Sequence, residues 1–202
     1  MKLLAMIPPP LRSVVELVLT LVVAVAIALA AQAYVVKPYR VPTASMVPTL
    51  EPGDRVLADR VTLRFRDPER GDIVVFHPPA CPDAISNNGV CDTNLIAKRT
   101  GVSDQTFIKR VIGLPGERVF SRNGKVYIQK PNGQPVPLNE PYVNGQETNI
   151  PTPVTVPKGY YYMLGDNRGD SEDSRVWGPE PREDILGIAR VRYWPVDRIG
   201  IL

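Results

Sequence analysis

Histidine is almost absent from this sequence: His77 is the only one in 202 residues. A serine hydroxyl is a weak nucleophile at neutral pH and must give up its proton to a positioned base as it attacks. Histidine is the usual base, so a serine hydrolase with this sequence either uses His77 or takes its base from another side chain. A lysine that burial keeps neutral is the main alternative.

Cysteine and blocks of like charge are also scarce. Cys81 and Cys91 are the only cysteines, and they bracket a short polar segment that a disulfide could close outside the cytosol; two reduced thiols fit nearly as well. Zinc would need ligands that one distant histidine does not supply, so we expect no metal and no cofactor. The net charge of +3 comes from interspersed charges, which argues against a nucleic-acid partner.

One long apolar run is present near the N-terminus. Residues 13–36 are interrupted only by Glu16, Thr20 and Gln32, and at roughly 1.5 Å per residue such a helix crosses a hydrocarbon core of roughly 30 Å. The run predicts a single transmembrane helix after an N-terminal tail, residues 1–12. A cleaved signal peptide is the alternative, because Ala31 and Ala33 flank Gln32 in a small-x-small pattern. Residues 37–202 then suffice for one compact domain.

Beyond residue 50 the sequence predicts a mostly β domain. Asn123-Gly124, between two apolar alternating runs, predicts a tight hairpin, because both residues accept positive φ. Segments 77–104 and 130–158 are rich in turn-forming residues and predict loops or extended excursions. Short runs rich in Val, Ile, Tyr and Phe predict seven strands, at Arg55–Ala58, Ile73–Phe76, Phe107–Ile112, Arg118–Phe120, Lys125–Gln129, Tyr160–Leu164 and Ile188–Tyr193.

Ser45 and Lys109 are the pair that can carry serine chemistry without histidine. Ser45 lies in the segment PTASMVPTL, nine residues beyond the apolar run. Lys109 lies in a predicted strand in which alternation places it on one face with Phe107 and Val111. Apolar neighbours would desolvate the amine and lower its pKa toward the range of a general base. The alternative is a surface lysine that extends its amine into water.

A third motif, residues 165–178 (GDNRGDSEDSRVWG), packs turn formers and opposite charges between two strand signals. As a calcium loop it fails, because Arg168 occupies a ligand position and the required glycine and terminal glutamate are misplaced. The segment favours a hydrogen-bonded network, and a solvated loop is the alternative.

These motifs, in this order, resemble those of type I signal peptidases, the membrane-bound serine-lysine endopeptidases. The resemblance rests on PTASMVPTL, on KRVIGLPGE from Lys109 and on GDNRGDSEDSR from Gly165, and the short region between the last two resembles the cyanobacterial or plastid branch. It implies an antiparallel β catalytic domain held outside the cytoplasm, on the periplasmic or lumenal side of a plasma or thylakoid membrane. The implied activity is removal of signal peptides from preproteins after Ala-x-Ala sites. We expect the protein to act as a monomer.

The resemblance also assigns roles to residues. Ser45 would be the nucleophile and Lys109 the general base, oriented by a hydrogen bond from Ser171, with Asp173 and Arg175 as a supporting ion pair. The backbone N–H of Ser45 and the hydroxyl of Thr43 would form the oxyanion hole. Residues aligned with the pocket walls are Met46, Leu50 and Phe107 for the first substrate position, and Tyr39, Val41 and Ile108 for the third. Gly169 departs from the family, which commonly has a polar residue there.

Two other classes remain open from the sequence. A self-cleaving serine-lysine peptidase shares the dyad, although the chain offers no DNA-binding module. A membrane-anchored β module without catalysis is the alternative outside the hydrolases, and it does not require Ser45 and Lys109 to approach each other. Ala31-Gln32-Ala33 also fits the cleavage pattern itself, which predicts slow self-cleavage after Ala33 if the chain is such a peptidase.

Overall fold

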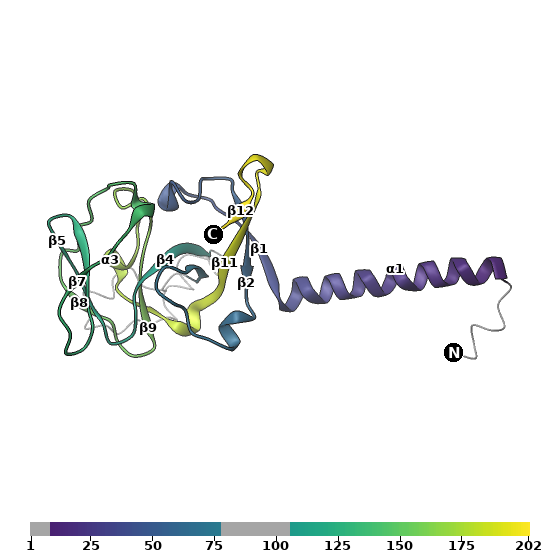
Figure 1. Ribbon diagram of the computed structural model, residues 1–202, viewed down its shortest axis with the longest axis horizontal. Coiled ribbons are helices and arrows are strands. Elements are labelled where there is room, and N and C mark those ends of the chain that lie inside the picture. The colour runs from purple at the N-terminus through teal and green to yellow at the C-terminus, as the bar shows by residue number, and fades with distance from the viewer. Residues whose placement is uncertain (1–8, 78–105) are drawn as a thin grey trace, which may run out of the picture.

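The computed structural model describes residues 9–77 and 106–202, with side chains of the N-terminal helix described for residues 13–27. Helix α1 (Pro9–Tyr34) projects from the β domain (Figure 1). It begins within the predicted tail, because prolines are tolerated in a first helical turn, where their missing N–H groups would have no partner. It ends before Val36, which already belongs to a strand. In the described part of the chain, no helix has the length and apolar character needed to cross a membrane.

The larger sheet has eight strands, all paired antiparallel. Its order is β1-β2-β11-β3-β4-β9-β10, with β12 paired to β11. The strands are β1 (Val36–Arg40), β2 (Arg55–Asp59), β3 (Ile73–Phe76), β4 (Phe107–Gly113), β9 (Tyr160–Leu164), β10 (Glu180–Pro181), β11 (Ile185–Trp194) and β12 (Gly200–Ile201).

The smaller sheet has the order β7-β6-β5-β8. It is built on the predicted hairpin, in which Asn123 and Gly124 both have positive φ. Its strands are β5 (Arg118–Arg122), β6 (Lys125–Gln129), β7 (Val136–Pro137) and β8 (Val154–Thr155). One buried cluster contains Ile112 of β4, Val126 of β6 and Leu164 of β9, so the two sheets share a core.

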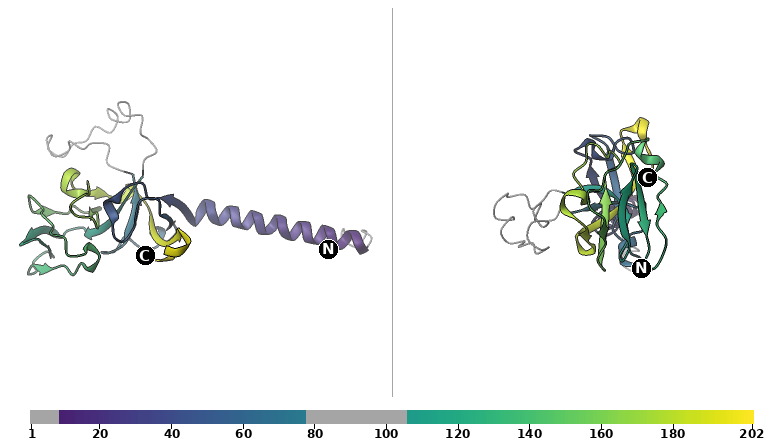
Figure 2. Two further views of the ribbon diagram at one scale, coloured as in Figure 1. Left: turned by 90° about the horizontal axis from the view of Figure 1, so that it is seen from above. Right: turned by 90° about the vertical axis from the view of Figure 1, so that its left-hand side faces the viewer.

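Short helical turns connect the strands. They are η2 (Ala44–Met46), η3 (Thr62–Arg64), η4 (Pro141–Val143), α3 (Ser174–Trp177), η5 (Arg182–Asp184) and η6 (Val196–Arg198). Figure 2 shows the same β domain from two further directions. The mostly β prediction is confirmed, as are all seven predicted strands.

Besides the start of α1, two features differ from prediction, and two predictions are not tested. Val36 was assigned to the membrane segment but opens β1, because residues 36–40 pair with β2. The predicted loop at 130–158 contains β7, β8 and η4, each too short for an alternation pattern to reveal. Cys81 and Cys91, and the predicted loop at 77–104 apart from His77, lie outside the described residues.

Candidate active site

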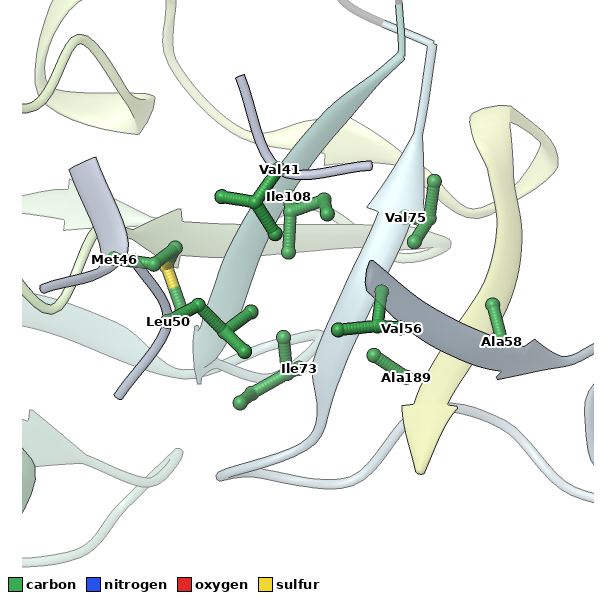
Figure 3. Packing of buried hydrophobic residues seen from close by; sticks show 9 residues of the cluster. All are labelled: Val41, Met46, Leu50, Val56, Ala58, Ile73, Val75, Ile108 and Ala189. Atoms are coloured by element: carbon green, nitrogen blue, oxygen red, sulfur yellow. The ribbon is translucent and has the colours of Figure 1, made fainter. Parts of the chain in front are cut away.

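Ser45 is held in place by the hydrophobic core next to it. It lies on the one-turn helix η2, next to Met46, whose buried side chain lies beside Leu50 in a cluster that also contains Val41 and Ile108 (Figure 3). Ser45 itself is 8% exposed. Burial of Met46 fixes the turn, so the hydroxyl of Ser45 stays in place without being sealed from solvent.

Lys109 lies on β4 and reaches Ser45. Its side chain is 4% exposed, and its Nζ lies 2.6 Å from Ser45 Oγ in a hydrogen bond across 64 residues of sequence. The alternative of a surface lysine is therefore wrong. Phe107 lies two residues earlier on β4, and its ring centroid is 6.0 Å from Nζ, as strand alternation predicts.

Burial shifts the protonation equilibrium of Lys109. Desolvation is the largest effect and lowers the pKa of the amine to about 8. Arg175 also lowers this pKa, whereas the carboxylates of Asp173, Glu172 and Asp166 act in the opposite direction. The neutral amine, which can accept the proton of a serine hydroxyl, is therefore populated near neutral pH.

The register of β4 with β9 brings the third motif to Lys109. Arg110 pairs with Leu164, the last residue of β9, in this antiparallel ladder, so Gly165, the residue after the strand, comes opposite Lys109. The motif also binds the backbone of η2: Asn167 N donates to Ser45 O at 3.0 Å, and Asn167 Nδ2 donates to Ala44 O at 3.1 Å. Three segments distant in sequence therefore meet at Ser45.

Ser171, Asp173 and Arg175 form a hydrogen-bonded network close enough to Lys109 to act on its charge. Arg175 binds both carboxylate oxygens of Asp173 at 2.8 Å, and this carboxylate also caps α3 by accepting from Arg175 N. Ser171 differs from the prediction. Its hydroxyl donates to Asp173 Oδ2 at 2.8 Å, and within the described residues no hydrogen bond joins it to Lys109, because the nearby carboxylate is the stronger acceptor.

Thr43 lies beside the serine hydroxyl. Its Oγ1 is 3.2 Å from Ser45 Oγ, and either oxygen can act as the donor. Its side chain lines the same cavity as Ser45 and Lys109. A hydroxyl here can donate to an oxygen that develops negative charge next to Ser45, the function expected of an oxyanion hole.

A second buried ion pair was not anticipated from the sequence. Arg110 donates to both oxygens of Asp166, at 2.8 and 2.7 Å, and Thr49 Oγ1 donates to Asp166 Oδ2 at 2.6 Å. The ion pair connects β4 to the third motif, and the hydrogen bond from Thr49 connects both to the segment after η2. Both residues lie in motifs that the sequence shows, Arg110 after Lys109 and Asp166 after Gly165. That Arg110 and Asp166 are in contact follows only from the pairing of β4 with β9.

A cavity of about 440 Å³ opens at Ser45 and Lys109. Four of the six residues predicted for the pockets line it: Met46, Phe107, Val41 and Ile108. Two predictions are wrong for this cavity. Leu50 is fully buried in the core beneath η2, and Tyr39 packs against that core from β1. Among the described residues, no group of three His, Cys, Asp or Glu side chains is arranged to hold a metal.

Comparisons with known proteins place the chain in a family. A family model described as "Signal peptidase, peptidase S26" matches residues 14–194. A probable signal peptidase I-2 of Synechocystis sp. is 41% identical, covering 96% of this chain and 79% of the relative. A signal peptidase I of Leptolyngbya laminosa is 40% identical, covering 91% and 81%. The thylakoidal processing peptidase 1 of Arabidopsis thaliana chloroplasts is 35% identical, covering 88% of this chain and 47% of the relative.

Among solved structures, a signal peptidase I from Enterococcus faecalis aligns with 31% identity and a TM-score of 0.41, covering 61% of this chain and 97% of that one. The match over residues 14–194 shows that the chain belongs to the signal peptidase family, peptidase S26. The relatives in cyanobacteria and chloroplasts confirm the predicted branch.

Proposed function

We propose that this chain removes signal peptides from preproteins by serine endopeptidase chemistry, with Ser45 as nucleophile and Lys109 as general base. The observation that carries the proposal is the 2.6 Å contact between Lys109 Nζ and Ser45 Oγ at the base of an open cavity. A non-catalytic binding module has no need to bury a lysine against a serine. Membership of the signal peptidase family supports the same conclusion.

Acylation follows from this geometry. The neutral amine of Lys109 accepts the proton of Ser45 while Oγ attacks the scissile carbonyl carbon. The carbonyl oxygen becomes an oxyanion, which the N–H of Ser45 and the hydroxyl of Thr43 stabilise. The ammonium of Lys109 then gives its proton to the departing amine, which leaves an ester on Ser45.

Deacylation uses the same groups again. With the leaving peptide gone, Lys109 is neutral and can deprotonate a water molecule that attacks the ester carbonyl. The second tetrahedral oxyanion lies in the same position as the first. When it collapses, Ser45 Oγ recovers the proton from Lys109, and the acid product leaves.

The cavity walls favour small side chains before the scissile bond. All four side chains line the cavity, and we assign Met46 and Phe107 to the first residue and Val41 and Ile108 to the third. These side chains offer apolar contact but limited depth, so alanine fits and a large residue would displace core side chains. This agrees with specificity for Ala-x-Ala sites.

The location of the substrate fits a membrane-anchored enzyme. Large apolar side chains along α1, from Val14 to Ile27, are exposed in the isolated chain and would be covered by lipid. Nine residues from Val36 to Ser45 reach at most roughly 30 Å, so such an anchor keeps Ser45 near the bilayer surface. A preprotein held by its own apolar segment would meet it there, on the periplasmic or lumenal side.

The test is cleavage of a preprotein with an Ala-x-Ala site by the full chain in detergent, at about pH 6.5 and about pH 8. We expect wild type to cleave, and faster at the higher pH because Lys109 loses its proton. Ser45→Ala and Lys109→Ala should be inactive. Lys109→Arg should also be inactive, because a guanidinium stays protonated.

Lys125→Ala is the matched control, since Lys125 is an exposed lysine on β6. It should cleave like wild type. Equal cleavage by all variants would mean that another nucleophile acts. No cleavage by wild type would favour the binding module, and cleavage confined to its own Ala31-Gln32-Ala33 segment would favour a self-cleaving peptidase.

A further inference from the structure

Glu180 is a buried carboxyl group that the proposed mechanism does not use. It lies on β10, and its side chain is 0% exposed. Within the described residues, neither carboxylate oxygen has a hydrogen-bond partner, and the indole N–H of Trp177 also has none. A carboxylate buried without partners is costly, so this environment favours the neutral acid.

The charge next to Glu180 also favours the neutral acid. Burial is the main cause that raises its pKa, to about 8, and the carboxylate of Asp184 raises it further. The indole N–H of Trp177 acts in the opposite direction, through a weak interaction with the carboxyl that falls short of hydrogen-bond geometry. Asp184 itself faces Glu183 and His77, and burial raises its pKa. No cation of the described residues is among the groups that act on Glu180.

The neighbouring strand adds no compensating charge. Glu180 pairs with Tyr161 of β9, where burial also raises the pKa of the phenol. Arg182 is the cation that lowers the pKa of this tyrosine, and it is paired with Asp67. The carboxyl of Glu180 therefore lies in an apolar site where Asp184 is the one charged group of the described residues that acts on it.

Trp177 connects this site to the catalytic cavity. Its ring lies 5.8 Å from that of Phe107, which in turn packs edge-on against Phe76 at 6.2 Å. Phe107 lines the cavity, and its ring lies beside Lys109. Trp177 also ends α3, which begins at the Asp173 cap. A shift of Trp177 would therefore reach both Phe107 and the Asp173 network.

We propose that Glu180 is a positioning residue: its neutral carboxyl keeps Trp177 and Phe107 packed beside Lys109, and its ionisation loosens this wall and lowers activity. The predicted effect of Glu180 on activity rests on the proposed peptidase function. Rising pH then has two opposite consequences. It frees the amine of Lys109 and at the same time ionises Glu180, so activity passes through a maximum instead of reaching a plateau.

The first test is the pH profile of kcat and KM for the full chain and for Glu180→Gln, which keeps the shape and cannot ionise. We expect equal activity within about twofold below about pH 7, and a variant roughly tenfold more active than wild type at about pH 9.5, because only wild type carries the buried anion. Glu183→Gln is the matched control. It removes an exposed acid from the adjacent turn and should keep the wild-type profile.

A second readout does not depend on cleavage. The chain has two tryptophans, Trp177 and Trp194, so Trp194→Phe leaves only the indole beside Glu180. Its fluorescence should change with pH with a midpoint near 8, and Glu180→Gln in the same background should abolish this change. If the glutamine variant does not fold, Glu180→Leu replaces it, since an apolar side chain suits the buried site.

Parallel pH profiles for wild type and variant, or an unchanged fluorescence titration in the variant, would overturn the role of Glu180. Absence of cleavage by wild type at every pH would contradict the proposed function instead. In that case, the fluorescence titration still decides whether Glu180 ionises against Trp177.

Discussion

Gly165 lies against the backbone of Ser45, with no room for a side chain between them. A Cβ atom on Gly165 would clash with the Ser45 carbonyl oxygen and with Ser171 Oγ. The φ of Gly165 is not in the left-handed region, so space alone demands glycine here. The contact allows the third motif to reach the turn that carries the nucleophile.

Gly165→Ala should therefore separate the third motif from Ser45. We expect a loss of about 1 to 3 kcal/mol in the free energy of unfolding, because backbone must move to admit the methyl group. We expect activity to fall by about 100-fold, since Ser45 shifts relative to Lys109. Denaturant unfolding and preprotein cleavage measure these effects. Gly169→Ala, where a Cβ meets nothing within 4 Å, is the control; equal losses in both variants would contradict the steric argument.

Thr43→Val tests the oxyanion hole. Valine has nearly the shape of threonine without the hydroxyl, so substrate binding should persist while the oxyanion loses one donor. We expect kcat to fall by roughly 10²- to 10³-fold with little change in KM. Thr43→Ser keeps the donor and should stay within about tenfold of wild type. A normal kcat for the valine variant would show that Thr43 is only a turn residue.

The sequence predicts the features that depend on local pattern. Alternation places Lys109 and Phe107 on one face, and Asn123-Gly124 identifies the hairpin, because both depend on neighbouring residues. Features that depend on strand register are not predictable in this way. The Arg110–Asp166 pair requires knowing that β4 and β9 are neighbours, and the two-residue strands leave no pattern to detect.

The burial of Glu180 is a second feature that the local sequence pattern does not predict. The stretch Gly178-Pro179-Glu180-Pro181 has the composition of an exposed turn, and local reasoning places its carboxyl in water. The structure instead pairs Glu180 with Tyr161 and buries it. Ser171 is a related case: its place near the lysine follows from the motif, but the carboxylate of Asp173, two residues later, takes its hydrogen bond.

Asp166→Asn tests the buried ion pair. The substitution leaves Arg110, whose side chain is 11% exposed, without its carboxylate. Breaking a buried pair on one side should lower the free energy of unfolding by about 3 kcal/mol. Activity should fall by roughly tenfold, because Asn167, the next residue, binds the backbone of Ser45. Asp67→Asn, an exposed partner of Arg182, is the control and should change stability by less than about 1 kcal/mol.

Lys109→Met should abolish activity and increase stability. In wild type, burial disfavours the ammonium, which holds the pKa of Lys109 at about 8 instead of 10.5. A shift of this size corresponds to about 3 kcal/mol, and loss of the bond to Ser45 offsets about 1 kcal/mol of it. We therefore expect the variant to be about 2 kcal/mol more stable at pH 7 in denaturant unfolding.

The pH dependence of that gain identifies its cause. Below pH 8 the lysine is charged in both the folded and unfolded states, so wild type carries the full cost of a buried ammonium. Between 8 and 10.5 the folded state loses its proton first; the unfolded state then binds more protons, and wild-type stability rises with pH. The advantage of Lys109→Met should therefore shrink across this window and disappear above it. An advantage that is constant with pH would mean that packing, and not the buried charge, stabilises the variant, and Lys109 would then titrate as an ordinary lysine.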